Sequence, residues 1–538
     1  MKIVAADTDW KVCDAIAKDR RLAAAVAVIG AHYPVTGPGV GDGRPRPPMP
    51  ASCYALKKPL WTSEGWNLRE VNDYQGAMNL GATINLNWIL EKQTAMIVWT
   101  AIFAWYSILP YGGDGSGFGH GLMTAVEPWS GHYSLRAPLY MLAHTAQFVH
   151  PGCKYVDSAS VMDGGVLSVT GSAEPAATAV AFVCDDDGTF TLVMETSEAS
   201  LPIHATLNLK VSPALQHNSS DQAIHVWETC NGSWFKQKDN LTTTQLEPNV
   251  DTGRRRISAL EIVLQPRCIY TLSTSTGQRP VHAASIPPSA PFPVPYFDNF
   301  DHYVDQGTVR YFTDQAGSWN AAPAPASSRN VSGMVLQQVV EEIPNGWSKN
   351  SDPHTIAGDD SWTNFAISAR GLIGSTSSLT ERLPGQPTPT YLKVCGRVGS
   401  YGEWHWPGAA PARGAPPNGY CLIVDVEGAY YISAGGKPGL IREVQNVIAS
   451  GKLARRPELG EVIDLRIEFS GNTILASVNG TNLPAVHDDT FSHGMVALGS
   501  GWNRASFDDV LISNAPPILP RAKSDDISAS SSARSPLG

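Results

Sequence analysis

The chain has 538 residues, more than one hydrophobic core usually spans, so several domains are expected. Only 16% of the residues are charged and the net charge is −10, which argues against nucleic acid as a partner because a phosphate backbone needs a basic surface. No stretch of about 20 apolar residues occurs, so the sequence predicts no transmembrane segment.

The first 149 residues alternate apolar strands with helical segments. Strands are predicted at residues 2–6, 25–29, 59–62 and 94–103, one helix at 10–24 and two helices within 70–90. Because these strands are apolar runs without alternation, we expect both of their faces to be buried, as in a parallel sheet. Polar or aromatic residues follow each strand, where a β/α barrel carries its active site. The pattern predicts half of such a barrel.

Short alternating strands replace this pattern after residue 150. Residues 150–282 predict a β-sandwich, with strands at 166–170, 179–184 and 190–195 and a turn at Asp187-Gly188. A Pro-rich linker occupies residues 283–297.

A second β domain is predicted at residues 298–514. Its strands include residues 422–426, 430–433, 462–469 and 473–478, and its Ala-, Pro- and Gly-rich segments at 321–329 and 383–418 are predicted to be loops. The Ser- and Ala-rich residues 515–538 are predicted to form a disordered tail. The predicted fold class is therefore multidomain, α/β followed by all-β.

Five N-glycosylation sequons all lie beyond residue 200, at Asn218, Asn231, Asn240, Asn330 and Asn479. Their concentration in the β-rich part indicates a secretory route. Residues 1–10 lack the basic start and apolar run of a signal peptide, and this conflict predicts that the N-terminus is missing. The eight cysteines are compatible with disulfides or with buried free thiols.

Glu64 stands at the end of the third predicted strand. A carboxylate there is costly to bury unless it serves a site or is paired. As a glycosidase nucleophile it would attack the anomeric carbon of a sugar. An exposed or arginine-paired loop glutamate would give the same spacing. A second carboxylate, Glu127, follows the last strand and is predicted to be a structural or rim residue.

Neighbouring strand ends carry residues that could complete a sugar site. His32 and Tyr33 could hydrogen-bond Glu64 and hold its geometry. Trp99 could form an apolar platform under a pyranose ring. Satisfied core side chains would explain the same three residues without any site.

Several strings, in order and spacing, resemble glycoside hydrolase family 59. They are Ile29-Gly30-Ala31-His32-Tyr33-Pro34, Leu60-Trp61-Thr62-Ser63-Glu64, Gly121-Leu122-Met123-Thr124-Ala125, Glu127-Pro128-Trp129-Ser130-Gly131-His132-Tyr133 and Ala143-His144-Thr145-Ala146-Gln147-Phe148. Beyond the linker the resemblance continues in Asp305-Gln306-Gly307, Arg310-Tyr311-Phe312 and Ser506-Phe507-Asp508-Asp509.

This resemblance implies a retaining hydrolase built from a TIM barrel, a β-sandwich and a lectin-like jelly-roll domain. Residues 1–149 would be barrel strands five to eight. Glu64 would be the nucleophile and Trp99 a substrate contact, beside Tyr33 and His32. The family's acid/base glutamate belongs to an Asn-Glu pair, and no such dipeptide occurs in this sequence. The resemblance therefore implies an N-terminally truncated chain, which we expect to be inactive by itself.

The implied reaction is hydrolysis of the β-galactosyl bond of galactosylceramide and related glycosphingolipids in the lysosome, without a catalytic cofactor. The resemblance also implies a saposin-like lipid carrier as partner. In the lectin-like domain it implies a structural Ca²⁺ held by Asn299, Asp301 and Asp508, oxygen ligands that suit a hard cation. Surface turn residues would explain these three positions equally well.

Two other interpretations fit the sequence. The chain could be a non-catalytic carbohydrate-binding protein whose barrel remnant is degenerate, or the product of an incorrect gene prediction.

Overall fold

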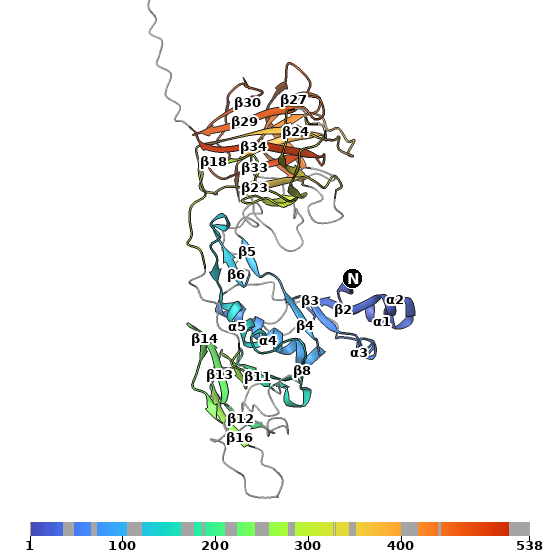
Figure 1. Cartoon of the computed structure of the whole chain (residues 1–538), viewed down its shortest axis with the longest axis vertical. Coiled ribbons are helices and arrows are strands. Elements are labelled where there is room, and N and C mark those ends of the chain that lie inside the picture. The colour runs from blue at the N-terminus through green and yellow to red at the C-terminus, as the bar shows by residue number, and fades with distance from the viewer. Residues whose placement is uncertain are drawn as a thin grey trace, which may run out of the picture. The chain divides into compact units, whose positions relative to one another are not determined.

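The structure is a computed structural model. It describes residues 2–35, 48–65, 73–104, 121–162, 177–184, 189–209, 223–242, 258–277, 286–326, 328, 330–343, 351–399, 418–438 and 443–515. The chain divides into two compact units, one made of Met1–Ile108 with Gly113–Pro291 and one that contains Phe292–Gly538 (Figure 1). Among the described residues, no helix is long and apolar enough to cross a membrane.

A four-stranded parallel sheet opens the first unit, in the order β1-β2-β3-β4. Its strands are β1 (Ile3–Thr8), β2 (Val26–His32), β3 (Leu60–Gly65) and β4 (Ala95–Val98), and the helices between them are α1 (Val12–Lys18), α2 (Arg20–Ala25) and α3 (Ala51–Ala55) (Figure 1). Trp10, Ile16, Ile29 and Leu60 are among the buried residues that join these helices to the sheet. The prediction of parallel strands separated by helices is confirmed.

Several predicted boundaries in this region were wrong. The helix predicted at 10–24 breaks at Asp19, whose side chain accepts hydrogen bonds from the backbone amides of Arg21 and Leu22 and so starts a second helix. In place of two helices within 70–90, the described part forms one, α4 (Tyr74–Glu91). The strand predicted at 94–103 is two strands, β4 and β5 (Ile102–Ala104), and β5 belongs to another sheet.

The prediction that all four strands are buried on both faces was also wrong. β2 is largely buried, whereas β1 is mostly exposed, with Ile3 at 44%. β4 is likewise open, since Ile97 is 50% exposed. Both are edge strands of this sheet, with one neighbour each, so their apolar sequence does not guarantee burial.

Helix α4 lies between the parallel sheet and an antiparallel one. Its Leu80 and Ile84 pack with Leu122 and with Met96 of β4, while Ala77 and Met78 pack against Val180, Val193 and Met141. Met141 belongs to α5 (Ala137–Ala146). Because α4 is covered from several sides, its buried residues include polar ones, among them Asn79, Asn85 and Asn87. The strands β5, β6 (Met123–Ala125) and β7 (Ser134–Leu135) form a small sheet nearby.

The remainder of the first unit is antiparallel, as predicted for residues 150–282. One sheet contains β8 (Cys153–Tyr155), β9 (Val161–Met162), β10 (Thr178–Cys184), β11 (Phe190–Glu195), β13 (Ala223–Cys230), β14 (Ser233–Gln237), β15 (Leu241–Thr242) and β17 (Ile269–Ser273), and a second pairs β12 (Ile203–Leu209) with β16 (Ser258–Leu264). The predicted strands at 179–184 and 190–195 are confirmed as β10 and β11. The strand predicted at 166–170 and the turn at Asp187-Gly188 lie outside the described residues.

The second unit contains two antiparallel sheets. One is formed by β18 (Tyr296–Asp298), β19 (Gly307–Thr308), β21 (Trp319–Pro323), β22 (Met334–Gln338), β24 (Phe365–Ile373), β29 (Val462–Ser470), β30 (Thr473–Val478), β31 (Thr481–Asn482), β32 (Val486–His487) and β34 (Ala505–Asn514). The other is formed by β20 (Thr313–Ala316), β23 (His354–Ala357), β25 (Tyr391–Gly399), β26 (Asn418–Asp425), β27 (Ala429–Pro438), β28 (Glu443–Lys452) and β33 (Met495–Ser500).

Two segments predicted to be loops carry strands instead. β25 lies inside 383–418 and is buried along its whole length, and β21 runs into 321–329. The loop prediction was wrong because it rested on composition: the apolar run of β25 is short, and the segments on both sides of it are rich in Pro and Gly. All eight cysteines form disulfides, which resolves the open question about thiols: Cys13–Cys53, Cys153–Cys184, Cys230–Cys268 and Cys395–Cys421.

Candidate active site

Glu64 and Tyr33 meet at the C-terminal ends of β2 and β3. The Tyr33 hydroxyl donates a hydrogen bond of 3.0 Å to Glu64 Oε1, and the backbone amide of Tyr33 donates to the Glu64 carbonyl at 2.9 Å. The Tyr33 ring is buried, and the Glu64 side chain is 35% exposed. The carboxylate is therefore oriented by the protein and still open to a ligand.

His32 links Glu64 to a carboxylate that the sequence did not single out. Its Nε2 lies 3.0 Å from Asp7 Oδ1 and 3.7 Å from Glu64 Oε2. Asp7 is near the end of β1, and His32 pairs in register with Glu64. Adjacent parallel strands bring their ends to one edge, so the position of Asp7 after an apolar run was a signal that could have revealed it. One imidazole nitrogen thus lies between two acids.

Trp99 follows β4 at the same edge. Its backbone amide donates to the carbonyl of Gly65 at 3.3 Å, so its chain position adjoins Glu64. The side chain is 44% exposed and meets Phe103 edge-on, with ring centroids 6.3 Å apart. The Trp99 ring is therefore partly open to solvent, and an open aromatic face is what stacking on a sugar requires.

Glu127 follows the end of β6 by two residues. It precedes a short 3₁₀ helix (Pro128–Ser130), and its carbonyl accepts the Ser130 hydroxyl at 2.6 Å. These are backbone contacts, so the assignment of Glu127 as a structural or rim residue stays a prediction.

The three predicted metal ligands lie in the second unit, at β18 and β34. Asp301 Oδ2 accepts from Asn299 Nδ2 at 3.0 Å, and Asp301 Oδ1 accepts from the Met334 amide at 3.0 Å. Burial and the neighbouring Asp509 and Asp301 raise the pKa of Asp508 to about 6, although Arg370 opposes the shift. Close carboxylates that repel each other, together with an amide oxygen, form a donor set that fits Ca²⁺.

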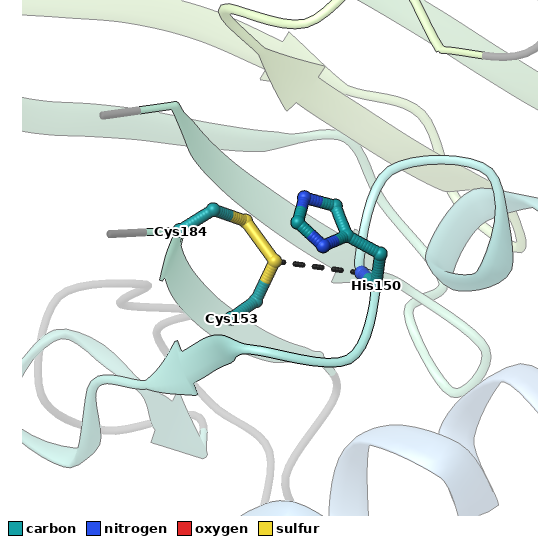
Figure 2. Close-up of side chains that lie close together, drawn as sticks. All are labelled: His150, Cys153 and Cys184. Atoms are coloured by element: carbon teal, nitrogen blue, oxygen red, sulfur yellow. Dashed lines mark hydrogen bonds between the residues drawn. A yellow bond between two sulfur atoms is a disulfide. The ribbon is translucent and has the colours of Figure 1, made fainter. Parts of the chain in front are cut away.

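A different cluster resembles a metal site without being one. Figure 2 shows the imidazole of His150 beside Cys153 and Cys184. The two sulfur atoms are joined in a disulfide, and Cys153 Sγ accepts the backbone amide of His150 at 3.4 Å. Metals bind thiolates, so this cluster is a covalent crosslink between β8 and β10.

Comparison with known proteins matches residues 1–147 to the model of glycosyl hydrolase family 59. Galactocerebrosidase of Danio rerio is 31% identical over 390 residues, which are 69% of this chain and 52% of that protein. Galactocerebrosidase of Homo sapiens is 30% identical over 394 residues, 68% of this chain and 50% of that protein.

Among solved structures, a GH30 endoxylanase from Clostridium papyrosolvens is similar with a TM-score of 0.33 at 15% identity, over 51% of this chain and 55% of its own. The chain spans about half the length of the curated relatives it matches. Residues 1–147 are similar to glycosyl hydrolase family 59, and about two thirds of the chain is similar to the galactocerebrosidases.

Proposed function

We propose that this chain is the sugar-cleaving part of a retaining glycoside hydrolase, with Glu64 as the nucleophile, that acts on the β-galactosyl bond of galactosylceramide and related glycosphingolipids. The observation that carries the proposal is the half-exposed Glu64 carboxylate, held by the Tyr33 hydroxyl at the carboxyl edge of a parallel sheet. Such a carboxylate can attack an anomeric carbon and form a glycosyl-enzyme. Trp99 would support the pyranose ring, and His32 would contact the sugar.

The proposed architecture follows from the order of the sheets. The strands β1 to β4 would be four strands of a TIM barrel, the antiparallel sheets of residues 150–282 a β-sandwich, and the second unit a lectin-like jelly roll. The proposed acid/base residue, a glutamate preceded by asparagine, is not encoded in these 538 residues. General acid catalysis contributes about 10²–10⁴-fold, so we propose that this chain alone is inactive on natural glycosides.

Three further assignments belong to the same proposal. A lysosomal or secreted location is supported by the sequons and by four disulfides, which persist in oxidising compartments. A saposin-like protein would present the lipid substrate. Ca²⁺ would bind Asn299, Asp301 and Asp508 and join the loop after β18 to β34, with no part in the chemistry.

An activated sugar tests the nucleophile without the acid. In 2-deoxy-2-fluoro-β-galactosyl fluoride the fluoride leaves without protonation, so attack by Glu64 alone would form a stable ester. We expect mass spectrometry of peptides from the purified chain to locate the label on Glu64. Glu64→Gln should remove the label, and the matched control Glu127→Gln should keep it. Labelling that persists in Glu64→Gln would refute the assignment.

The second candidate is a non-catalytic carbohydrate-binding protein. It is favoured by the large β-sheet content and by the missing Asn-Glu pair. Galactoside binding that survives Glu64→Gln, without any labelling of the wild-type chain, would support it.

A further inference from the structure

An aromatic pocket lies beside one of the five sequons. It has a volume of ≈ 330 Å³ and is lined by Asp73, Tyr74, Leu135, Arg136, Ala137, Tyr140, Asn231 and Trp234. This volume is at the lower end of the range for small-molecule sites, about 300–1,000 Å³. The pocket belongs to the first unit and shares no residue with the Glu64 site.

Asn231 occupies an exposed hairpin turn. Cys230 pairs with Ser233, so Asn231 and Gly232 form a two-residue loop between β13 and β14, with Gly232 at φ 77°. Glycine adopts this positive φ without steric strain, which suits it to the second position of the turn. The disulfide from Cys230 to Cys268 fixes its base. Asn231, the acceptor asparagine of this sequon, is therefore exposed at the surface and also lines the pocket.

The pocket wall is a rigid aromatic surface. Tyr140 stacks on Trp234 with ring centroids 5.5 Å apart at 22°, and Tyr74 meets Trp234 edge-on at 5.8 Å. The Tyr74 hydroxyl also donates to the carbonyl of Arg267, the residue before Cys268 of the disulfide that holds the turn. Asp73 and Arg136 add an acceptor and donors for hydroxyl and amide groups.

Other described sequons differ from Asn231. Asn240 Oδ1 is bonded to His225 Nδ1 at 3.0 Å and to Gln237 Nε2 at 3.1 Å. Asn479 Oδ1 accepts the Asp464 backbone amide at 2.8 Å. Their side chains take part in the fold, and neither residue lines the aromatic pocket.

We propose that Asn231 carries an N-linked glycan whose first N-acetylglucosamine packs in the pocket formed by Tyr74, Tyr140 and Trp234. The apolar face of the sugar would lie on the aromatic wall, and its N-acetyl and hydroxyl groups would bond Asp73 and Arg136. Because the sugar is covalently attached next to the pocket, its effective concentration there is high, and weak stacking is enough to hold it. The inference rests on the proposed secretory route.

The test uses the full chain secreted from cells that add high-mannose glycans. Peptide mapping is expected to find Asn231 occupied. Endoglycosidase H leaves the first sugar in place, so the melting temperature should not change. Peptide N-glycosidase F removes that sugar, and its action on the native protein should be about 2- to 12-fold slower at Asn231 than at Asn479, as a stacking contact of ordinary strength would give. In denatured protein the two rates should be equal.

Substitutions in the pocket wall test the packing of the sugar without removing its attachment site. Trp234→Ala should keep Asn231 occupied and make release there as fast as at Asn479, and Tyr140→Leu should have the same effect if Trp234→Ala is not secreted. Equal native release rates at the two sites in the wild type would overturn the proposal. So would a bare Asn231 with Asn479 occupied, which would leave the secretory route intact, whereas no occupied sequon at all would overturn both.

A free disaccharide tests whether the protein's own glycan already fills the pocket. Saturation-transfer NMR with N,N′-diacetylchitobiose should show binding to Asn231→Gln, whose pocket is open, and none to the glycosylated wild type. Equal binding to both proteins would mean that the protein's own glycan does not fill the pocket, and would overturn the inference.

Discussion

Tyr33 is the residue that orients the proposed nucleophile, because its buried phenol donates to Glu64 Oε1 at 3.0 Å. A hydrogen bond to a charged group contributes about 1.5–3 kcal/mol, so Tyr33→Phe should slow the labelling of Glu64 by about 10- to 100-fold. The measurement is the rate at which the fluorosugar labels Glu64.

Tyr54→Phe is the matched control, since that phenol bonds the Leu90 carbonyl and lies apart from Glu64. It should leave the rate within about twofold of the wild type. An unchanged rate in Tyr33→Phe would show that this hydrogen bond does not orient the nucleophile.

His144 is a buried neutral imidazole in the first unit. Its Nδ1 and Nε2 lie 2.9 and 2.8 Å from the hydroxyls of Thr271 and Thr229. Thr271 donates its own hydrogen to the His144 carbonyl, and Thr229 accepts the Phe235 amide, so Nδ1 donates and Nε2 accepts. Burial lowers the pKa of His144 to about 3.

This histidine should make the protein less stable in acid. Between pH 6.5 and 3 the unfolded chain binds a proton on this residue and the folded chain does not, so the free energy of unfolding falls by about 1.4 kcal/mol per pH unit as the pH drops through this range. Denaturant unfolding at pH 7 and pH 4.5 checks it. His144→Gln should show a shallower pH dependence than the wild type, and the exposed-site control His225→Gln should not. Parallel pH profiles for wild type and His144→Gln would contradict the assignment.

At the scale of elements, a buried ion pair links β25 to β28. Lys393 Nζ lies 3.0 Å from Glu443 Oε1, with side chains 0% and 1% exposed. Gln445 also donates to Glu443 Oε1, and Ser433 donates to Gln445 at 3.1 Å. The network joins β25, β27 and β28 of one sheet, of which only β27 and β28 pair directly.

Removing one partner of this ion pair should lower the free energy of unfolding more than replacing both partners. Lys393→Met leaves a buried carboxylate unpaired and should lower the free energy of unfolding by about 3–5 kcal/mol, whereas Lys393→Met with Glu443→Gln should lose markedly less. The exposed pair Arg382–Glu427 is the control, and Arg382→Met should cost at most about 1 kcal/mol. A double variant as unstable as the single one would contradict this account of the pair.

At the scale of the whole molecule, the two compact units should unfold separately. Three of the four disulfides lie in the first unit. Reduction should therefore lower the free energy of unfolding of the first unit more than that of the second, by about 2–4 kcal/mol per crosslink. The proposed Ca²⁺ site lies in the second unit. Calcium at 100 times its dissociation constant should stabilise that unit by about 2.7 kcal/mol, and EDTA should reverse the shift.

Calorimetry of the intact chain measures both transitions. Asp508→Asn should abolish the calcium shift, and Asp489→Asn, an exposed residue of the same unit, should preserve it. If calcium still stabilises the second unit in Asp508→Asn, the proposed calcium site is wrong.

The sequence by itself determined the local features of this protein. Apolar runs followed by polar residues predicted β1 to β4 and placed Glu64, Tyr33 and His32 at one edge, because strand period and strand ends are properties of short segments. The family motifs were also local strings, and the comparisons confirmed the resemblance that they predicted.

Only the tertiary structure decided what depends on contacts between distant segments. It brought Asp7 to His32, exposed the edge strands β1 and β4 and paired the cysteines. It also buried Lys393, which lies in a segment whose composition predicted a loop, against Glu443 of β28. The physical reason is that burial and pairing are set by neighbours in space, and a residue's neighbours along the chain carry little information about them.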